Sequence, residues 1–187
     1  MQAFSKIALV VALGLSAAGV MAGEISDTDI RADNADNRAE VSGSRALQHI
    51  GVTFGSGRIL NLQVNAQNAE NRASASGSVA HQDIGRALAG GTMDNVRVHA
   101  TNAKNHARGT NSTATQQIGS VQNGTMRDVV INARNAHNDA FGDSTATQEI
   151  GKVTNGTMQR VNIFADNAYN RANGAGAVAE QKIGVVN

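Results

Sequence analysis

Apolar and small residues alternate with polar ones along most of this chain, and one alternating pattern recurs five times. The pattern reads Ile/Val-x-Ala-x-Asn-Ala-x-Asn-x-Ala, and its copies begin at Ile30, Val64, Val98, Ile131 and Ile163. A second motif, Gln-x-Ile-Gly, follows every copy at a matching interval. An apolar period of two is typical of β-strands, and no copy has the sustained i, i+3, i+4, i+7 stripe of a helix. The sequence therefore predicts an all-β protein built from repeats.

The repeats predict a β-solenoid, or a stack of β-arches, with five rungs of about 33 residues each. Together the rungs form a single predicted repeat domain over residues 23–187. Whether one unit is a two-strand arch or a three-strand coil stays open at this point. The units lie near residues 30–51, 64–85, 98–119, 131–151 and 163–184.

Within a unit the alternation changes parity once, and this change predicts a bend. In the fourth unit the apolar positions up to Asn135 share one face, and the alternation resumes from Ala136 on the other parity. A bend or bulge is needed to return the apolar positions to the core after such a slip. The Asn-Gly pairs at Asn123 and Asn155 predict a second turn, which suits either an antiparallel hairpin or the corner of a solenoid coil.

Positions that stay the same in all copies are expected to face the core, and the variable positions between them to face solvent. The repeated asparagines and glutamines would then be buried, where an unpartnered polar group costs roughly 1–3 kcal/mol. Stacked identical rungs remove this cost, because each side-chain amide can bond to its equivalent in the next rung. Replacing both Asn102 and Asn105 by Leu is therefore expected to disrupt the stack.

Three such amide ladders and one set of turn glycines are predicted. The first ladder consists of Asn34, Asn68, Asn102, Asn135 and Asn167. The second ladder consists of Asn37, Asn71, Asn105, Asn138 and Asn170. The third ladder consists of Gln48, Gln82, Gln116, Gln148 and Gln181. The predicted turn glycines, each at the end of a strand, are Gly51, Gly85, Gly119, Gly151 and Gly184.

The first 22 residues have the pattern of a secretory signal peptide. One cation, Lys6, precedes an apolar run from Ile7 to about Val20, and Val20 and Ala22 suit the −3 and −1 positions of a cleavage site. The run is short for a membrane span, which needs roughly 20 residues. We expect cleavage after Ala22 and a secreted product that inserts into no membrane.

Composition and charge narrow the function further. Aromatic residues make up 3% of the chain, and Pro, Cys and Trp are absent, so Ala, Val, Ile and Leu must build the core without disulfides or thiolate metal sites. The formal net charge of +1 includes Lys6, so the chain without its signal peptide is neutral. Neutrality argues against an electrostatic nucleic-acid binder and removes the repulsion that keeps identical molecules apart.

The sequence offers little for catalysis or cofactor binding. Carboxylates are spread over variable positions, and no nucleophile sits in an elbow motif. The stretch 33–37 lacks the Gly and Glu of an EF-hand calcium loop. We therefore predict no enzyme, no cofactor and no metal. A zinc site needs ligands that converge on one point. We expect the five histidines to be separate, solvated surface residues instead; they are His49, His81, His99, His106 and His137.

Repeats with regularly spaced Asn, Gln, Ala and Gly behind a signal peptide resemble bacterial functional-amyloid subunits, with curli and Fap fibres as the nearest comparisons. In these families the repeats stack as β-arches with Asn and Gln ladders, and the fibre serves adhesion and the biofilm matrix. The resemblance implies an extracellular or cell-surface protein of a Gram-negative-type bacterium that polymerises with itself. It suggests a nucleator and an outer-membrane secretion channel as further partners.

Two functions follow from these expectations. A self-assembling fibre subunit is favoured by a stack whose two ends we expect to be uncapped, since such ends recruit further copies. A junction between copies would place Asp166 by Asp33 and Arg171 by Arg38, at a cost of a few tenths of a kcal/mol each. The alternative is a non-polymerising β-solenoid adhesin, whose variable outer face, including Phe164, would bind a glycan or a host surface.

Overall fold

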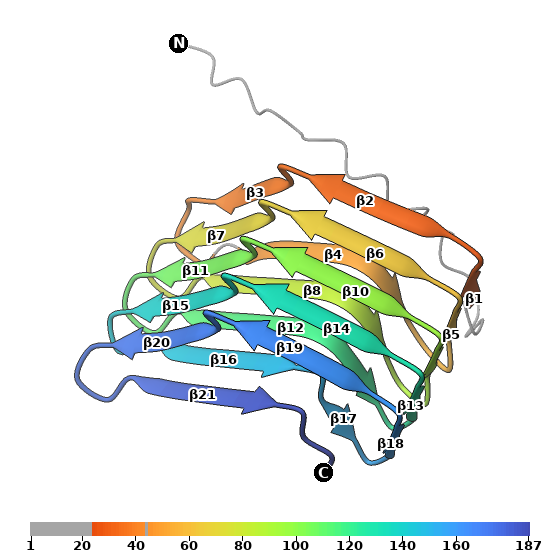
Figure 1. Cartoon of the computed structure of the whole chain (residues 1–187). Helices are drawn as coiled ribbons and strands as arrows, with labels where there is room; N and C mark the ends of the chain where they lie inside the picture. Colours follow the sequence, from red (N-terminus) through yellow and green to blue (C-terminus); the bar gives the residue numbers. More distant parts are fainter. Residues whose placement is uncertain (1–23, 44) are drawn as a thin grey trace.

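In a computed structural model, which describes residues 24–43 and 45–187, the chain winds as a β-solenoid of five turns (Figure 1). Each turn contributes one strand to each of four sheets, and all strand pairs are parallel. The predicted all-β stack of five rungs is confirmed, and each rung has four strands rather than two or three. The predicted signal peptide lies outside the described residues.

The strands of the four sheets follow one another around each turn. The first sheet contains β1 (Glu24–Ser26), β5 (Arg58–Leu60), β9 (Thr92–Asp94), β13 (Thr125–Arg127) and β18 (Thr157–Gln159). The second contains β2 (Asp29–Asp33), β6 (Gln63–Gln67), β10 (Arg97–Thr101), β14 (Val130–Arg134) and β19 (Asn162–Asp166). The third contains β3 (Asp36–Ala39), β7 (Glu70–Ser74), β11 (Lys104–Arg108), β15 (His137–Phe141) and β20 (Tyr169–Asn173). The fourth contains β4 (Arg45–Thr53), β8 (Val79–Ala87), β12 (Thr113–Gln122), β16 (Thr145–Ile150) and β21 (Val178–Ile183), with β17 (Val153–Thr154) beside β12.

The register places equivalent motif residues directly beside one another. Asn105 pairs with Asn71 and Asn138, and Gln116 pairs with Gln82 and Gln148. This register follows from burial, because a slip by one residue would turn every core side chain of a strand to the solvent. The same residues therefore form columns that run through all five turns.

The core has two parts of different chemistry. Larger side chains, such as Ile84, Met93 and Ile131, fill the space bounded by the first, second and fourth sheets. Between the third and fourth sheets the buried apolar residues are all alanines, such as Ala107 and Ala114. Small side chains allow these two sheets to approach closely, which brings the polar residues of one sheet within reach of the backbone of the other.

Two predicted turns have a different form from the one expected. Three of the predicted turn glycines, Gly51, Gly85 and Gly119, lie inside the continuous strands β4, β8 and β12. Gly119 therefore does not end its strand. Its φ is +59°, and a Cβ there would lie 2.5 Å from Ile131 Cδ1, so both conformation and space require glycine. Strands β16 and β21 do end immediately before their glycines. Asn123 and Asn155 are at a corner of the coil, and the antiparallel hairpin is wrong because every pair is parallel.

The turns differ in length only at two of their four connections. The connection from the fourth to the first sheet takes nine positions from Ile84 to Met93 but eight from Ile118 to Met126. The connection from the third to the fourth sheet is one residue shorter in the fourth turn than in the third. The corners between the first, second and third sheets keep their length, so these two connections absorb the irregularity of the repeat.

Candidate functional site

The predicted glutamine ladder runs through the core between the third and fourth sheets. Each Nε2 donates to the Oε1 of the preceding turn, over distances of 2.5–2.7 Å. The same Nε2 of Gln116 also donates to the carbonyl of Ala103 at 3.0 Å. Gln82, Gln116 and Gln148 are completely buried, so the ladder satisfies polar groups that water cannot reach.

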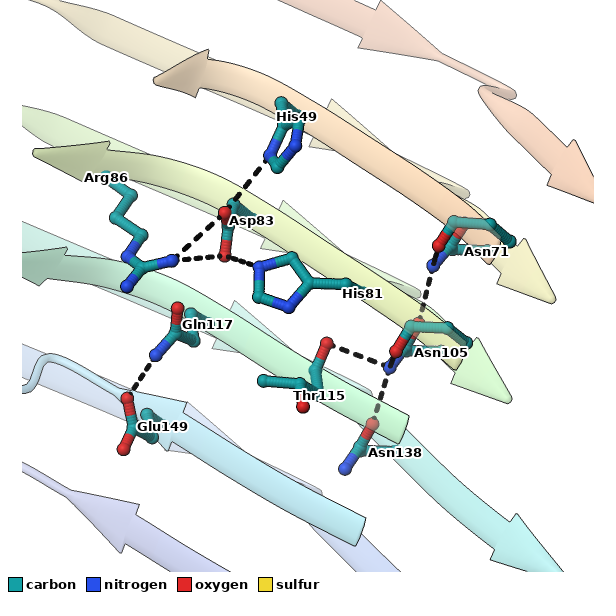
Figure 2. A network of polar contacts seen from close by, with 12 residues as sticks. His49, Asn71, His81, Asp83, Arg86, Asn105, Thr115, Gln117, Asn138 and Glu149 are labelled. Atoms are coloured by element: carbon teal, nitrogen blue, oxygen red, sulfur yellow. Dashed lines mark hydrogen bonds and ion pairs between the residues drawn. The ribbon is translucent and has the colours of Figure 1, made fainter. Parts of the chain in front are cut away.

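The second predicted ladder has equally short bonds and the opposite direction. Each Nδ2 donates to the Oδ1 of the following turn, and all four bonds are 2.8 Å long. The Nδ2 of Asn105 also donates to the carbonyl of Ala80 at 3.1 Å and to that of Thr115 at 3.0 Å, and Figure 2 shows the bond to Thr115. Asn71, Asn105 and Asn138 are completely buried. This ladder therefore joins neighbouring turns and also joins the third sheet to the fourth.

The first predicted ladder forms, but its predicted burial is wrong. Successive amides are 2.8–3.1 Å apart, with each Nδ2 donating to the preceding turn. These asparagines lie at the corner between the second and third sheets with φ near +52° to +56°, and their side chains are exposed or half-buried. The change of parity at these asparagines could have indicated that they lie at a corner, because Asn adopts left-handed backbone at turns more readily than most residues.

A further stack at the corner between the first and second sheets was not predicted. Asn61 donates to Asp27 at 2.9 Å, and Asn95 donates to Asn61 at 2.8 Å. In the last two turns this column holds an ion pair, with Arg160 Nη2 2.7 Å from Asp128 Oδ2. All five residues have positive φ. Their even spacing along the sequence could have revealed the corner, although the residue type changes from turn to turn.

The ladders leave different polar atoms on the two end faces of the stack. Among the described residues, no turn precedes the first, so Gln48 Nε2 and Asn34 Nδ2 lack the side-chain acceptor that every inner equivalent has. Gln48 Nε2 still donates to the carbonyls of Ala35 and Glu70, and Gln48 is 2% exposed. On the last turn Gln181 Oε1 and Asn167 Oδ1 lack the corresponding donor. The second ladder runs the other way, so its acceptor is on the first face and its donor on the last. The two faces are complementary in every ladder.

The last turn also leaves core columns uncovered by any described strand. Ile183 is 42% and Val186 is 48% exposed, whereas their equivalents Ile150 and Val153 one turn earlier are completely buried. Strands β18, β19, β20 and β21 are the last strand of their sheets, and no described strand pairs with their outer edge (Figure 1). This face combines apolar surface with backbone groups ready to pair.

The expectation that the histidines are separate surface residues is wrong for three of them. His49 Nδ1 lies 3.0 Å and His81 Nε2 lies 2.9 Å from the carboxylate of Asp83 on the outer side of the fourth sheet (Figure 2). Burial raises the pKa of Asp83, but bonds from both histidines and the charge of Arg86 outweigh it, so the pKa is well below its ordinary value. His106 similarly lies 3.1 Å from Asp139.

No protein-family model, curated protein or solved structure matches this chain. No helix of sufficient length and hydrophobicity to cross a membrane occurs in residues 24–43 and 45–187.

Proposed function

We propose that this protein is a secreted fibre subunit whose solenoids stack end to end, as in functional amyloids, to build an adhesive or matrix scaffold at the cell surface. The observation that carries the proposal is the complementarity of the two end faces. If the last turn of one copy lies on the first turn of the next, donors meet acceptors in all three ladders. In a head-to-head arrangement two identical faces would meet, and this match of donor with acceptor in every ladder would be lost.

Apolar and backbone groups support the same arrangement. A junction would bury Ile183, which is 42% exposed on the last turn, in the column where Ile84, Ile118 and Ile150 are completely buried. The outer edges of four parallel sheets would be paired at once, and head-to-tail contact of this kind does not close, so it generates a filament.

Charges at such a junction are mixed. Asp166 would lie by Asp33 and Arg171 by Arg38, but Arg38 is already 3.0 Å from Asp36 and all these groups are well exposed. The corner column would bring Arg160 next to Asp27, which repeats the contact that Arg160 makes with Asp128 inside the chain. Exposed pairs of either sign are worth little, so the buried columns decide the association.

Filament formation can be tested with a substitution that acts only at the junction. Ala179 is exposed on the last turn but continues the column of Ala80, Ala114 and Ala146, which are completely buried. Ala179→Lys leaves its ammonium in water in a single molecule but buries it, unpaired, at a junction. We expect the parent chain to form unbranched filaments with a 4.7–4.8 Å meridional reflection, and the variant to stay monomeric with an unchanged circular dichroism spectrum.

Asn173→Lys is the matched control, because it adds the same charge to the last turn at an outward, exposed position. It should assemble like the parent. A parent chain that remains a monodisperse particle at high concentration, or an Ala179→Lys variant that forms filaments as readily as the parent, would overturn the proposal. A monodisperse parent would instead favour the adhesin, whose outer face exposes Phe164 and Tyr169.

A further inference from the structure

We propose that His49, His81 and Asp83 form a binding site for one divalent transition-metal ion, of which Zn²⁺ is the best fit. The site lies on the outer side of the fourth sheet in the first two turns, where β4, which carries His49, is the first strand of that sheet. One ligand comes from β4 and two from the neighbouring β8.

The three side chains already converge on one point. One ligand atom from each, a ring nitrogen of either histidine and a carboxylate oxygen, lies within 4.8 Å of the other two. Ligands of a tetrahedral Zn²⁺ at roughly 2.0–2.1 Å are about 3.3 Å apart, so small side-chain rotations suffice. Since the sheet holds the backbones in register, little order has to be gained on binding.

The chemistry of the ligands also suits Zn²⁺. Two imidazoles and one carboxylate are a common set for a zinc ion that keeps a fourth position for water. His49 and His81 are 34% and 25% exposed at their side chains, so an ion can enter from solvent, while Asp83 is 1% exposed.

Arg86 is the competitor that a metal ion must displace. Its Nη1 lies 3.2 Å from both oxygens of Asp83, so the guanidinium occupies the side of the carboxylate that a metal ion would need (Figure 2). Arg86 also lines a cavity of about 190 Å³ together with Gln117 and Glu149 of the next two turns. In this cavity Arg86 has room to turn away from Asp83, and the carboxylate of Glu149 is a second anion that Arg86 could approach.

The site occurs once within the described turns. In the column of Asp83 the later turns carry Gln117, Glu149 and Lys182, and in the column of His81 they carry Thr115, Thr147 and Glu180. Only the first two turns combine two imidazoles with a carboxylate, so the expected stoichiometry is one ion per chain.

Isothermal titration of the purified chain with Zn²⁺ tests the site. We expect one ion per chain, and His81→Ala should weaken binding by roughly ten-fold or more because it removes a ligand. Arg86→Gln should strengthen binding by roughly ten-fold, because a positive charge next to the ion is removed. A purely structural histidine–aspartate cluster would not produce that gain.

His99→Ala and His137→Ala are the controls, because both histidines lie on other sheets. Both should bind like the parent, and circular dichroism should show that every variant is folded. The proposal is overturned if the parent binds no Zn²⁺ at micromolar concentration, if a control weakens binding as much as His81→Ala, or if Arg86→Gln leaves the affinity unchanged.

Discussion

The two asparagine ladders have the same side chains and nearly the same bond lengths, yet they lie in opposite surroundings. Asn105 is completely buried on a strand and bonds to two neighbouring turns and two carbonyls. Asn102 lies at a corner with φ of +53° and is half-buried. The first position needs an amide because the surrounding groups are desolvated, and the second because the backbone is left-handed. A repeated residue in a solenoid can therefore be fixed by burial or by backbone conformation.

Asn105→Leu should break the buried ladder with the largest effect. It removes the bonds to Asn71 and Asn138 and leaves the carbonyls of Ala80 and Thr115 without this donor in the dry interior. We expect the free energy of unfolding in urea to fall by about 3–5 kcal/mol. A loss below about 1 kcal/mol would contradict the role of burial at this position.

Gly119→Ala sharpens the comparison, because Gly119 combines left-handed backbone with burial. The added methyl would meet Ile131 in the core, and φ is +59°. We expect a loss of about 2–4 kcal/mol in the same urea measurement. Gly77→Ala is the control: φ is +71° but nothing lies within 4 Å of the added Cβ, so only about 1 kcal/mol should be lost. Equal losses at both glycines would show that packing against Ile131 contributes nothing.

Asn102→Leu should have the smallest effect of the three. Leucine is strained in the left-handed conformation, and the amide bonds to Asn68 and Asn135 that it removes are largely open to water. We expect a loss of about 1–2 kcal/mol, and a loss of about 0.5 kcal/mol or less for Asn102→Gly, which adopts this backbone without strain. If the glycine variant lost as much as the leucine variant, the amide stack rather than the backbone would be what this position needs.

The rungs and their register could be predicted because identical residues recur at nearly constant intervals. Copies of Gln-x-Ile-Gly align in only one way, and the structure pairs them as expected. The number of strands could not be predicted, since strands of three residues such as β5 and β9 are too short for alternation to be recognised. The burial of Asn102 was predicted wrongly because a corner residue belongs to neither face of a strand.

The cluster around Asp83 escaped prediction for a related reason. Comparison of the copies identifies columns in which the residue stays the same, and it treats the other columns as independent surface positions. Those columns are stacked just as closely, so His49 and Asp83, which differ in type, are register partners. Reading each variable column as a list of neighbours would have brought the two residues together.

The two connections of variable length mark where this chain tolerates insertions. Because the strands keep their pairing while the connections from the third to the fourth and from the fourth to the first sheet gain or lose a residue, a foreign peptide placed there should leave the register intact. Peptides inserted in successive turns would project from one side of the protein at intervals of roughly 4.8 Å, the spacing between neighbouring strands. The solenoid would then serve as a display scaffold with molecular-scale spacing.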